Sequence, residues 1–239
     1  MTAKKEKNIR LIEVPSEVGA GTRGASLGIE AVKIAALDFR SKFFKTYRSI
    51  VIPNDNAALH GNPGSRYAKH VRSLLKMYER IGAAVRDTIR DNRFPLLLSG
   101  DHSNAGGTLA GIRMAYPESR VGVIWIDAHA DLHSPYTSPS GNLHGMPLAT
   151  ALNEDNIEEK VNDLDYETID LWEMLKNVGD ICPKIEYRDL VYITLRDFEE
   201  QEAALIKQNK VKVVSTNELR KTGITKLSRE ILRYLSACD

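Results

Sequence analysis

The sequence predicts an α/β fold in which a mainly parallel sheet carries helices on both faces. Short apolar runs alternate along the chain with longer segments of helical period, and repeated strand–helix units of this kind build parallel sheets. Several of the apolar runs are hydrophobic on both faces, as strands in the middle of a layered protein are. With 239 residues, of which 42% are hydrophobic, the chain is long enough to bury a large core.

The elements follow in order from these patterns. The short apolar runs predict strands over residues 8–14, 48–52, 94–98, 121–126, 190–195 and 211–214. The longer periodic segments predict helices over residues 29–39, 65–91, 105–115, 166–177, 199–208 and 225–236. The sequence shows no internal repeat, low-complexity tract or interdomain linker, so we expect a single domain over residues 1–239.

Composition excludes several classes of protein. A formal charge of +1 leaves no electrostatic footprint for nucleic acid or an anionic membrane, and we expect neither partner. No run approaches the roughly 18 apolar residues of a membrane span. Residues 1–10 are polar and lysine-rich, without the apolar core of a signal peptide. Two cysteines, Cys182 and Cys238, are too few for a disulfide framework, so we expect a reducing, cytoplasmic setting.

The most informative segment directly follows the predicted strand 121–126. Asp127, His129 and Asp131 occupy alternate positions there, and they project the same way if the backbone stays extended. Three potential metal ligands then converge past the carboxyl end of a strand, where open α/β sheets place their binding clefts. Each residue alone is more typical of a turn carboxylate or a packed histidine, but the grouping favours a metal site.

A second cluster, Gly-Asp-His-Ser at residues 100–103, follows the predicted buried strand 94–98 and begins a helix. If the two strands are neighbours, about 4.8 Å apart, His102 can share one metal centre with Asp127, His129 and Asp131. Imidazoles and carboxylates without a thiolate suit Mn²⁺ best, with Zn²⁺, Fe²⁺ or Co²⁺ as alternatives.

Residues 138–147 form a third polar run, Ser-Pro-Ser-Gly-Asn-Leu-His-Gly-Met-Pro. The Ser, Gly and Pro content predicts a rigid loop whose hydroxyl, amide and imidazole groups can bind a small polar substrate. Alone, such a loop is more typical of a surface connection, but its place just beyond the metal-type cluster favours a site. His144 is the candidate for proton transfer because the ordinary pKa of histidine lies near neutrality.

Together these three motifs resemble the arginase family of ureohydrolases and stand in that family's order. The likeness extends to residues 19–24 and 195–199 and covers most of the chain. Within the family, Ser-Gly-Asn-Leu-His-Gly at residues 140–145 is similar to the arginase branch rather than to agmatinases or formimidoylglutamases.

The resemblance implies a three-layer αβα sandwich with two Mn²⁺ ions bridged by hydroxide, which attacks the guanidinium carbon of L-arginine to give L-ornithine and urea. By position it implies these metal ligands: His102, Asp127 as the bridge, His129 and Asp131. It implies these contacts to the substrate: His133, Ser138, Ser140 and Asn142 with the α-carboxylate, and Glu199 with the α-amino group. His144 matches the proton shuttle, and Asp131 counts with it among the catalytic groups. The family also implies a homo-oligomer.

The chemistry is consistent with this reading. A guanidinium is resonance-stabilised, so its hydrolysis needs a nucleophile far better than neutral water. Metal ions supply one by lowering the pKa of bound water from about 15.7 toward about 7. The departing amine must also gain a proton, which His144 can deliver.

Two kinds of departure from the family pattern stand out. His133 replaces the common Asn and Glu199 the common Asp, which alters the shape of the amino-acid end of the pocket. The family's later Ser-Phe-Asp-x-Asp-x-x-Asp run and a later Glu are also absent from this sequence. We therefore expect a C-terminally incomplete arginase-like chain, truncated before the second Asp-x-Asp motif. Four ligands cannot fill two sites of about five or six donors each, so we expect poor Mn²⁺ binding, little turnover and a tendency to associate.

Other readings stay open. Gly19-x-Gly21-x-x-Gly24 has the spacing of a dinucleotide fingerprint, although its glycines do not lead straight into a helix. A metal-dependent deacetylase, with a similar fold and one Zn²⁺, is a second alternative. A third is a catalytically incomplete subunit or scaffold, and a fourth is a related guanidino or amidino hydrolase.

Overall fold

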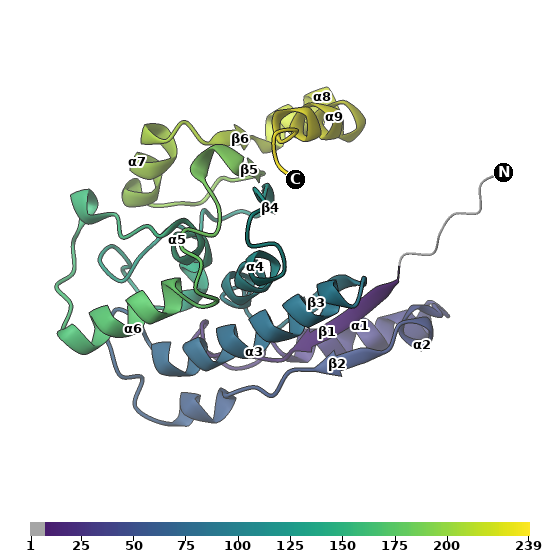
Figure 1. Cartoon of the computed structure of the whole chain (residues 1–239), viewed down its shortest axis with the longest axis horizontal. Coiled ribbons are helices and arrows are strands. Elements are labelled where there is room, and N and C mark those ends of the chain that lie inside the picture. Colours follow the sequence, from purple (N-terminus) through teal and green to yellow (C-terminus); the bar gives the residue numbers. More distant parts are fainter. Residues whose placement is uncertain (1–7) are drawn as a thin grey trace.

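The computed structural model describes residues 8–239, so residues 1–7, within the segment interpreted as carrying no signal peptide, lie outside the described part. Six strands confirm the predicted positions. They are β1 (Ile9–Val14), β2 (Ser49–Val51), β3 (Phe94–Ser99), β4 (Val123–Ile126), β5 (Leu190–Ile193) and β6 (Lys212–Val214). All pairings are parallel, but they form two separate three-stranded sheets, ordered β2-β1-β3 and β4-β5-β6. Figure 1 shows α4 between the two groups of strands and α3 alongside β1 and β3.

The predicted helices are also present, although their bounds shift. The described helices are α1 (Leu27–Asp38), α2 (Phe43–Thr46), α3 (Val71–Arg90), α4 (Asn104–Ala115), α5 (Pro147–Leu152), α6 (Tyr166–Lys176), α7 (Glu200–Gln208), α8 (Thr216–Thr222) and α9 (Ile224–Tyr234). The predicted start of the helix at residue 65 is wrong, because His70 takes a left-handed conformation with φ 58° and α3 begins only after it. Its backbone N–H donates instead to the carbonyl of Pro63 at 2.7 Å.

The first sheet is covered on both faces. Ile12 and Val14 of β1 belong to a core cluster with Leu74 and Tyr78 of α3. On the opposite face, Glu13 accepts a hydrogen bond from Lys33 of α1 at 2.7 Å. The alternation of side chains along β1 therefore places α3 and α1 on opposite sides of the sheet.

The second sheet is layered in the same way. Trp125 and Tyr192 pack in one core cluster with Leu205 of α7. From the other face, Ile193 belongs to a separate cluster with Ile231 of α9. Helices on both faces of parallel strands confirm the three-layer architecture that the sequence predicts.

The two sheets are held together by close packing of α4 against α3. A Cβ at Gly111 of α4 would lie 2.6 Å from the carbonyl oxygen of Gly82 and 2.6 Å from Cβ of Val85, both on α3. Glycine is therefore needed at position 111 for the two backbones to approach this closely. Because α4 begins at Asn104, two residues after His102, this contact also helps to fix the start of the candidate site.

Residues 94–98 and 121–126 are less buried than predicted, and the condition that the two strands are neighbours is not met. Within residues 8–239, β3 pairs only with β1 and β4 only with β5, so each lies at the edge of its own sheet. Phe94 is 54% exposed, Ile126 is 72% exposed, and Ile124 is exposed on the same face of β4. Apolar side chains of β3 and β4 are exposed because each strand is an edge strand, and no described element covers its free edge. In the described part, no helix is long and apolar enough to cross a bilayer.

Candidate active site

The candidate site lies past the carboxyl ends of β3 and β4. His102 stands in the turn between β3 and α4, and Asp127 directly follows β4. Nδ1 of His102 is 3.0 Å from Oδ2 of Asp127 and 2.9 Å from Oδ2 of Asp131. One ligand atom from each of the three residues lies within 4.8 Å of the others. Side chains from the two sheets therefore meet even though β3 and β4 are not paired.

Trp125 supports this cluster from beneath. The His102 ring stacks on the indole with a centroid separation of 4.6 Å and an interplanar angle of 19°. Nε1 of Trp125 donates to Oδ2 of Asp131 at 3.2 Å. The backbone of Asp131 is left-handed, with φ 53°, which turns the chain out of the strand direction. The indole and this turn together fix the carboxylate of Asp131 beside the imidazole.

His129 lies beside the cluster and not within it. The predicted extended backbone ends at Ile126, and the carboxylate of Asp127 accepts the backbone N–H of His129 at 3.0 Å. The His129 side chain is 63% exposed, with Nδ1 3.4 Å from Oδ1 of Asp127 and Nε2 3.6 Å from Oδ2 of Asp197. The condition of an extended backbone is therefore not met beyond Ile126, His129 does not join Asp127 and Asp131, and its role as a ligand stays a prediction.

The chemistry of the donor set fits a divalent cation. Burial lowers the pKa of His102, but the hydrogen bond and charge of Asp131 and the charge of Asp127 raise it by more, so the net pKa is raised. A proton on Nδ1 of His102 lies close to the carboxylates of both Asp127 and Asp131. A metal ion in place of that proton would be bound by the same three side chains. One imidazole and two carboxylates without a thiolate suit a cation of intermediate hardness.

The loop predicted over residues 138–147 is present up to Met146, because α5 begins at Pro147. Oγ of Ser138 accepts the backbone N–H of Gly141 at 2.9 Å. Gly141 has a φ of 70°, in the left-handed region, and a Cβ there would lie 2.8 Å from Cα of Tyr67. His144, in a short 3₁₀ turn, donates its backbone N–H to the carbonyl of Gly19 at 3.0 Å. These contacts hold the loop against two earlier segments of the chain.

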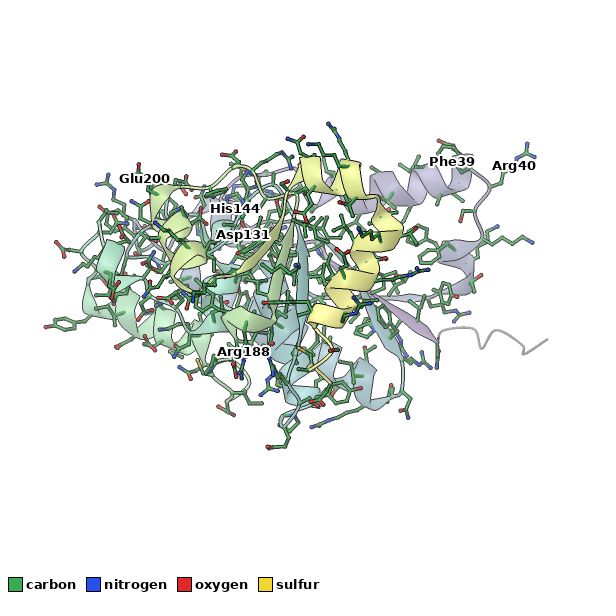
Figure 2. All side chains as sticks on the ribbon, turned by 90° about the horizontal axis from the view of Figure 1, so that it is seen from above. Phe39, Arg40, Asp131, His144, Arg188 and Glu200 are labelled. Carbon is green, nitrogen blue, oxygen red and sulfur yellow. The ribbon has the colours of Figure 1, made fainter. Side chains whose placement is uncertain are left out.

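A cavity of about 330 Å³ lies between this loop and the histidine–carboxylate cluster. Every predicted site residue except Asp127 lines it, namely His102, His129, Asp131, His133, Ser138, Ser140, Asn142, His144 and Glu199. Figure 2 shows Asp131 and His144 on the same side of the molecule, with Phe39 at the far end. A larger cavity, of about 480 Å³, lies between the starts of α3 and α6. Neither of the two groups of potential metal donors found among residues 8–239 belongs to that larger cavity.

The second donor group lines the end of the pocket near α7. Nε2 of His133 is 2.9 Å from Oε2 of Glu199 and 3.6 Å from Oε2 of Glu202. Burial raises the pKa of Glu202, whereas the hydrogen bond from His133 lowers the pKa of Glu199. Both carboxylates thus face the predicted substrate site.

Sequence reasoning missed Glu202, although a signal for it was present. Glu199 and Glu202 form a capping box at the start of α7, in which each side chain accepts the other's backbone N–H. Two acidic residues at this spacing lie on the same face of a helix. Asp197, which also lines the pocket, was missed as well.

The glycine-rich segment at residues 19–24 does not offer a phosphate site. Two of its three glycine N–H groups are already bound to carboxylates: Gly19 donates to Asp101 at 2.9 Å, and Gly24 donates to Glu17 at 2.7 Å. A dinucleotide site needs such amides free to meet a pyrophosphate. The geometry therefore argues against the dinucleotide alternative.

Comparison with known proteins gives separate evidence about the family of this chain. Residues 7–239 match the family model described as the arginase family. The chain is 36% identical over 236 residues to the arginase of Bacillus subtilis (strain 168), covering 98% of this chain and 73% of that protein. The solved structure of arginase from Bacillus caldovelox is similar with a TM-score of 0.78 at 33% identity, covering 96% of this chain and 72% of that one. Formimidoylglutamase from Bacillus subtilis subsp. subtilis str. 168 is similar in fold, with a TM-score of 0.66 at 19% identity, covering 100% of this chain and 64% of that one.

Proposed function

The chain belongs to the arginase family of hydrolases, and from this premise we propose that it is a manganese-dependent ureohydrolase that converts L-arginine and water to L-ornithine and urea. The observation that carries the proposal is the convergence of His102, Asp127 and Asp131 at one end of a pocket that His144 also lines. The fold alone does not decide the substrate, since formimidoylglutamase shares it.

The metal would be held by His102, Asp127 and Asp131, with His129 next to Asp127 as the fourth predicted ligand. When bound, such a cation lowers the pKa of a water molecule and so makes a nucleophile available at neutral pH. The chain's own contribution is to fix the donors before the cation arrives. Trp125 does so by stacking on His102 and by donating to Asp131.

His144 is placed to move a proton. Its side chain lines the pocket, and its backbone is tied to Gly19, so the imidazole projects from a fixed 3₁₀ turn. The C–N bond of the substrate breaks only as the departing nitrogen gains a proton, and histidine is the side chain most often suited to deliver one near neutral pH.

The remaining pocket residues orient the substrate. Ser140 and Asn142 offer a hydroxyl and an amide from the loop, while Glu199 and Glu202 offer carboxylates from α7. Opposite ends of the cavity are thus suited to the α-carboxylate and the α-amino group. The Ser138 hydroxyl already accepts the N–H of Gly141, so we assign Ser138 first to the shape of the loop.

A catalytically incomplete subunit or scaffold is the second candidate. It is favoured by the count of donors, because among residues 8–239 only three ligand residues converge at the metal end and His129 lies beside them. We also propose that the chain forms a homo-oligomer and works in a reducing compartment. The two free cysteines, Cys182 and Cys238, support the reducing compartment.

The test is urea release by the Mn²⁺-loaded chain from L-arginine, agmatine and 4-guanidinobutyrate, alongside calorimetric titration of Mn²⁺. We expect Asp131→Asn to abolish tight metal binding, and His144→Asn to leave metal binding intact while lowering turnover by about 10²–10⁴-fold. His70→Asn, outside the pocket, is the control and should change neither. Tight Mn²⁺ binding without urea from any of the three compounds would favour the scaffold instead.

A further inference from the structure

The carboxylate of Asp101, the residue before His102, is buried and fully engaged within the protein. Its Oδ1 accepts the backbone N–H of Ser103 at 2.8 Å and also the Ser103 hydroxyl. Its Oδ2 accepts the backbone N–H groups of Gly19 at 2.9 Å and of Ala20 at 3.3 Å. Three of these four donors are backbone N–H groups, which cannot accept in return. Asp101 is therefore a shared acceptor for two segments that lie 82 positions apart in the chain.

The backbone at Gly19 packs directly against the turn between β3 and α4. A Cβ at Gly19 would lie 2.2 Å from Oγ of Ser103 and 2.9 Å from Oδ1 of Asp101. Both separations are well below van der Waals contact, so a larger side chain at position 19 would push the two segments apart. Asp101 has little freedom to yield, because its backbone N–H donates to the carbonyl of Ser16 at 3.0 Å and its carbonyl accepts the hydroxyl of Ser99 at 2.9 Å. The contact thus fixes residue 19 relative to this turn.

Gly19 in turn holds the backbone of His144. The carbonyl oxygen of Gly19 accepts the backbone N–H of His144 at 3.0 Å. On the other side of the short 3₁₀ turn, the carbonyl of Gly145 accepts the backbone N–H of His133 at 3.2 Å. His144 is exposed, and within the described part of the chain its imidazole has no hydrogen bond or ion pair. The position of the imidazole in the pocket therefore depends on these backbone contacts.

We propose that Asp101 is a positioning residue that links the turn of His102 to the turn of His144 through Gly19. By fixing the backbone of His144 relative to His102, it sets where the proton-transfer imidazole stands with respect to the metal end of the pocket. This rests on the proposed function, because it takes the two histidines to act in one reaction. Neither Asp101 nor Gly19 lines the cavity, so both act through His144 and not on the substrate. A displacement of a reacting group by about 1 Å is enough to cost about 10²-fold in rate.

Amide hydrogen exchange on the metal-free chain tests the link without depending on turnover. Asp101→Ala removes the shared acceptor, so the N–H groups of Gly19 and His144 should exchange at least about tenfold faster, beyond any change in the amides of β5. Asp189→Ala is the matched control, because Asp189 is also a buried acid, bonded to Arg120 at 2.8 Å before β5. It should destabilise the fold without a selective change at His144.

Two further measurements localise the effect. Ser103→Ala removes the hydroxyl from Oδ1 of Asp101 but leaves Oδ2 bound to Gly19, so exchange at His144 should stay within about threefold of the parent value. Gly19→Ala strains the same contact from the opposite side and should reproduce the effect of Asp101→Ala. In the parent chain, the amides of Gly19 and His144 should open together, with protection within about threefold of one another. That last result needs no variant.

A double-mutant cycle on the Mn²⁺-loaded chain separates positioning from a purely structural role. Asp101→Ala alone should lower the kcat of urea release by about 10–10²-fold. In a chain that already carries His144→Asn, the same change should lower kcat by less than about threefold, because the group it positions is gone. Thermal unfolding of each variant shows whether it is folded.

Unchanged exchange at His144 in Asp101→Ala would overturn the proposal, and so would independent opening of Gly19 and His144 in the parent chain. Effects on kcat that multiply in the double variant would overturn it as well, because Asp101 would then act through the fold or through His102. A parent chain that releases no urea would count against the proposed function alone, since hydrogen exchange still decides whether Asp101 holds His144 in place.

Discussion

At the scale of single residues, His102 joins the two sheets through its contacts with Asp127 and Asp131. These carboxylates raise its pKa above the ordinary value of 6.5 despite burial. The charged imidazole therefore stabilises the metal-free fold at pH values below about 6.5, and this contribution is lost as the pH rises through the raised pKa. Metal binding has the opposite dependence, because it requires the imidazole to release its proton.

The first prediction concerns His102→Asn in the presence of a chelator. The loss of unfolding free energy relative to the parent chain should be largest near pH 6 and should shrink toward pH 9, because the ionic contacts exist only while His102 is protonated. Urea denaturation across this range measures it. His60→Asn, at an exposed histidine outside the cluster, serves as the control. A difference that does not vary with pH would show that packing on Trp125 is the main contribution of His102.

The second prediction concerns Glu17, whose buried side chain anchors the loop at residues 19–26. Burial raises its pKa, but hydrogen bonds from Ser26, Gly24 and Arg23 outweigh this and lower the pKa from 4.5 to about 2. Glu17→Gln should therefore cost about 1–3 kcal/mol of unfolding free energy at pH 7. The stabilisation by Glu17 is present above pH 4.5 and is lost as the pH falls toward 2.

Denaturant titrations at pH 7 and pH 3 measure this effect. The difference in unfolding free energy between the parent chain and Glu17→Gln should be smaller at pH 3. Glu30→Gln is a matched control, since Glu30 is an exposed acid paired with Lys33 on the surface. An equal difference in unfolding free energy at both pH values would mean that the Glu17 side chain contributes through its shape and not through its charge.

At the scale of elements, the contact between α3 and α4 sets the geometry on which the site is built. The third prediction is that Gly111→Ala destabilises the fold by about 1–3 kcal/mol, because its new methyl group meets the carbonyl of Gly82. Gly28→Ala in α1 is the matched control, because a Cβ there has no heavy atom within 4 Å. It should be neutral or stabilising by up to about 1 kcal/mol. Thermal and chemical unfolding compare the two, and equal effects would contradict the close packing.

Much of the element order was predictable from the sequence. The six strands are short apolar runs, and six of the helices carry a clear period, so local pattern was sufficient to find them. Helices α2, α5 and α8 were missed because each has seven residues or fewer and shows no full period. The start of α3 was wrong because no periodicity reveals the left-handed backbone of His70.

The candidate site was predictable in its membership but less so in its geometry. His102 and Asp131 meet, although β3 and β4 lie in separate sheets and the strand pairing considered from the sequence is not present. His129 does not join them, since period-2 alternation holds only while the backbone stays extended. The pairing of His133 with Glu199 joins residues 66 positions apart, and only tertiary structure could place them together.

At the scale of the whole molecule, the described chain consists of two layered halves with separate sheets. The burial expected of β3 and β4 could not be judged from sequence, because it depends on what lies beside each strand in space. Ile124 and Ile126 of β4 stay exposed on one face, and β3 is only partly buried. Unpaired edges and apolar faces of this kind promote association between copies.

The fourth prediction is therefore that the chain associates as its concentration rises, and that Ile126→Lys shifts it toward the monomer. Sedimentation velocity at several concentrations measures the effect. Val161→Lys is the control, because Val161 is an apolar residue of similar exposure on a connection away from β4. Association that is unchanged by Ile126→Lys but reduced by Val161→Lys would place the contact elsewhere.

Because β3 and β4 are not paired within residues 8–239, the contacts of His102 with Asp127 and Asp131 join two sheets that share no strand hydrogen bonds. His102 follows a strand of the first sheet, and Asp127 and Asp131 follow a strand of the second. A cation bound by all three would therefore link the two sheets. A ligand that binds only the assembled form adds RT ln(1 + [L]/Kd) to its stability. Here that increment would oppose separation of His102 from Asp127 and Asp131, and so of the two sheets that carry them.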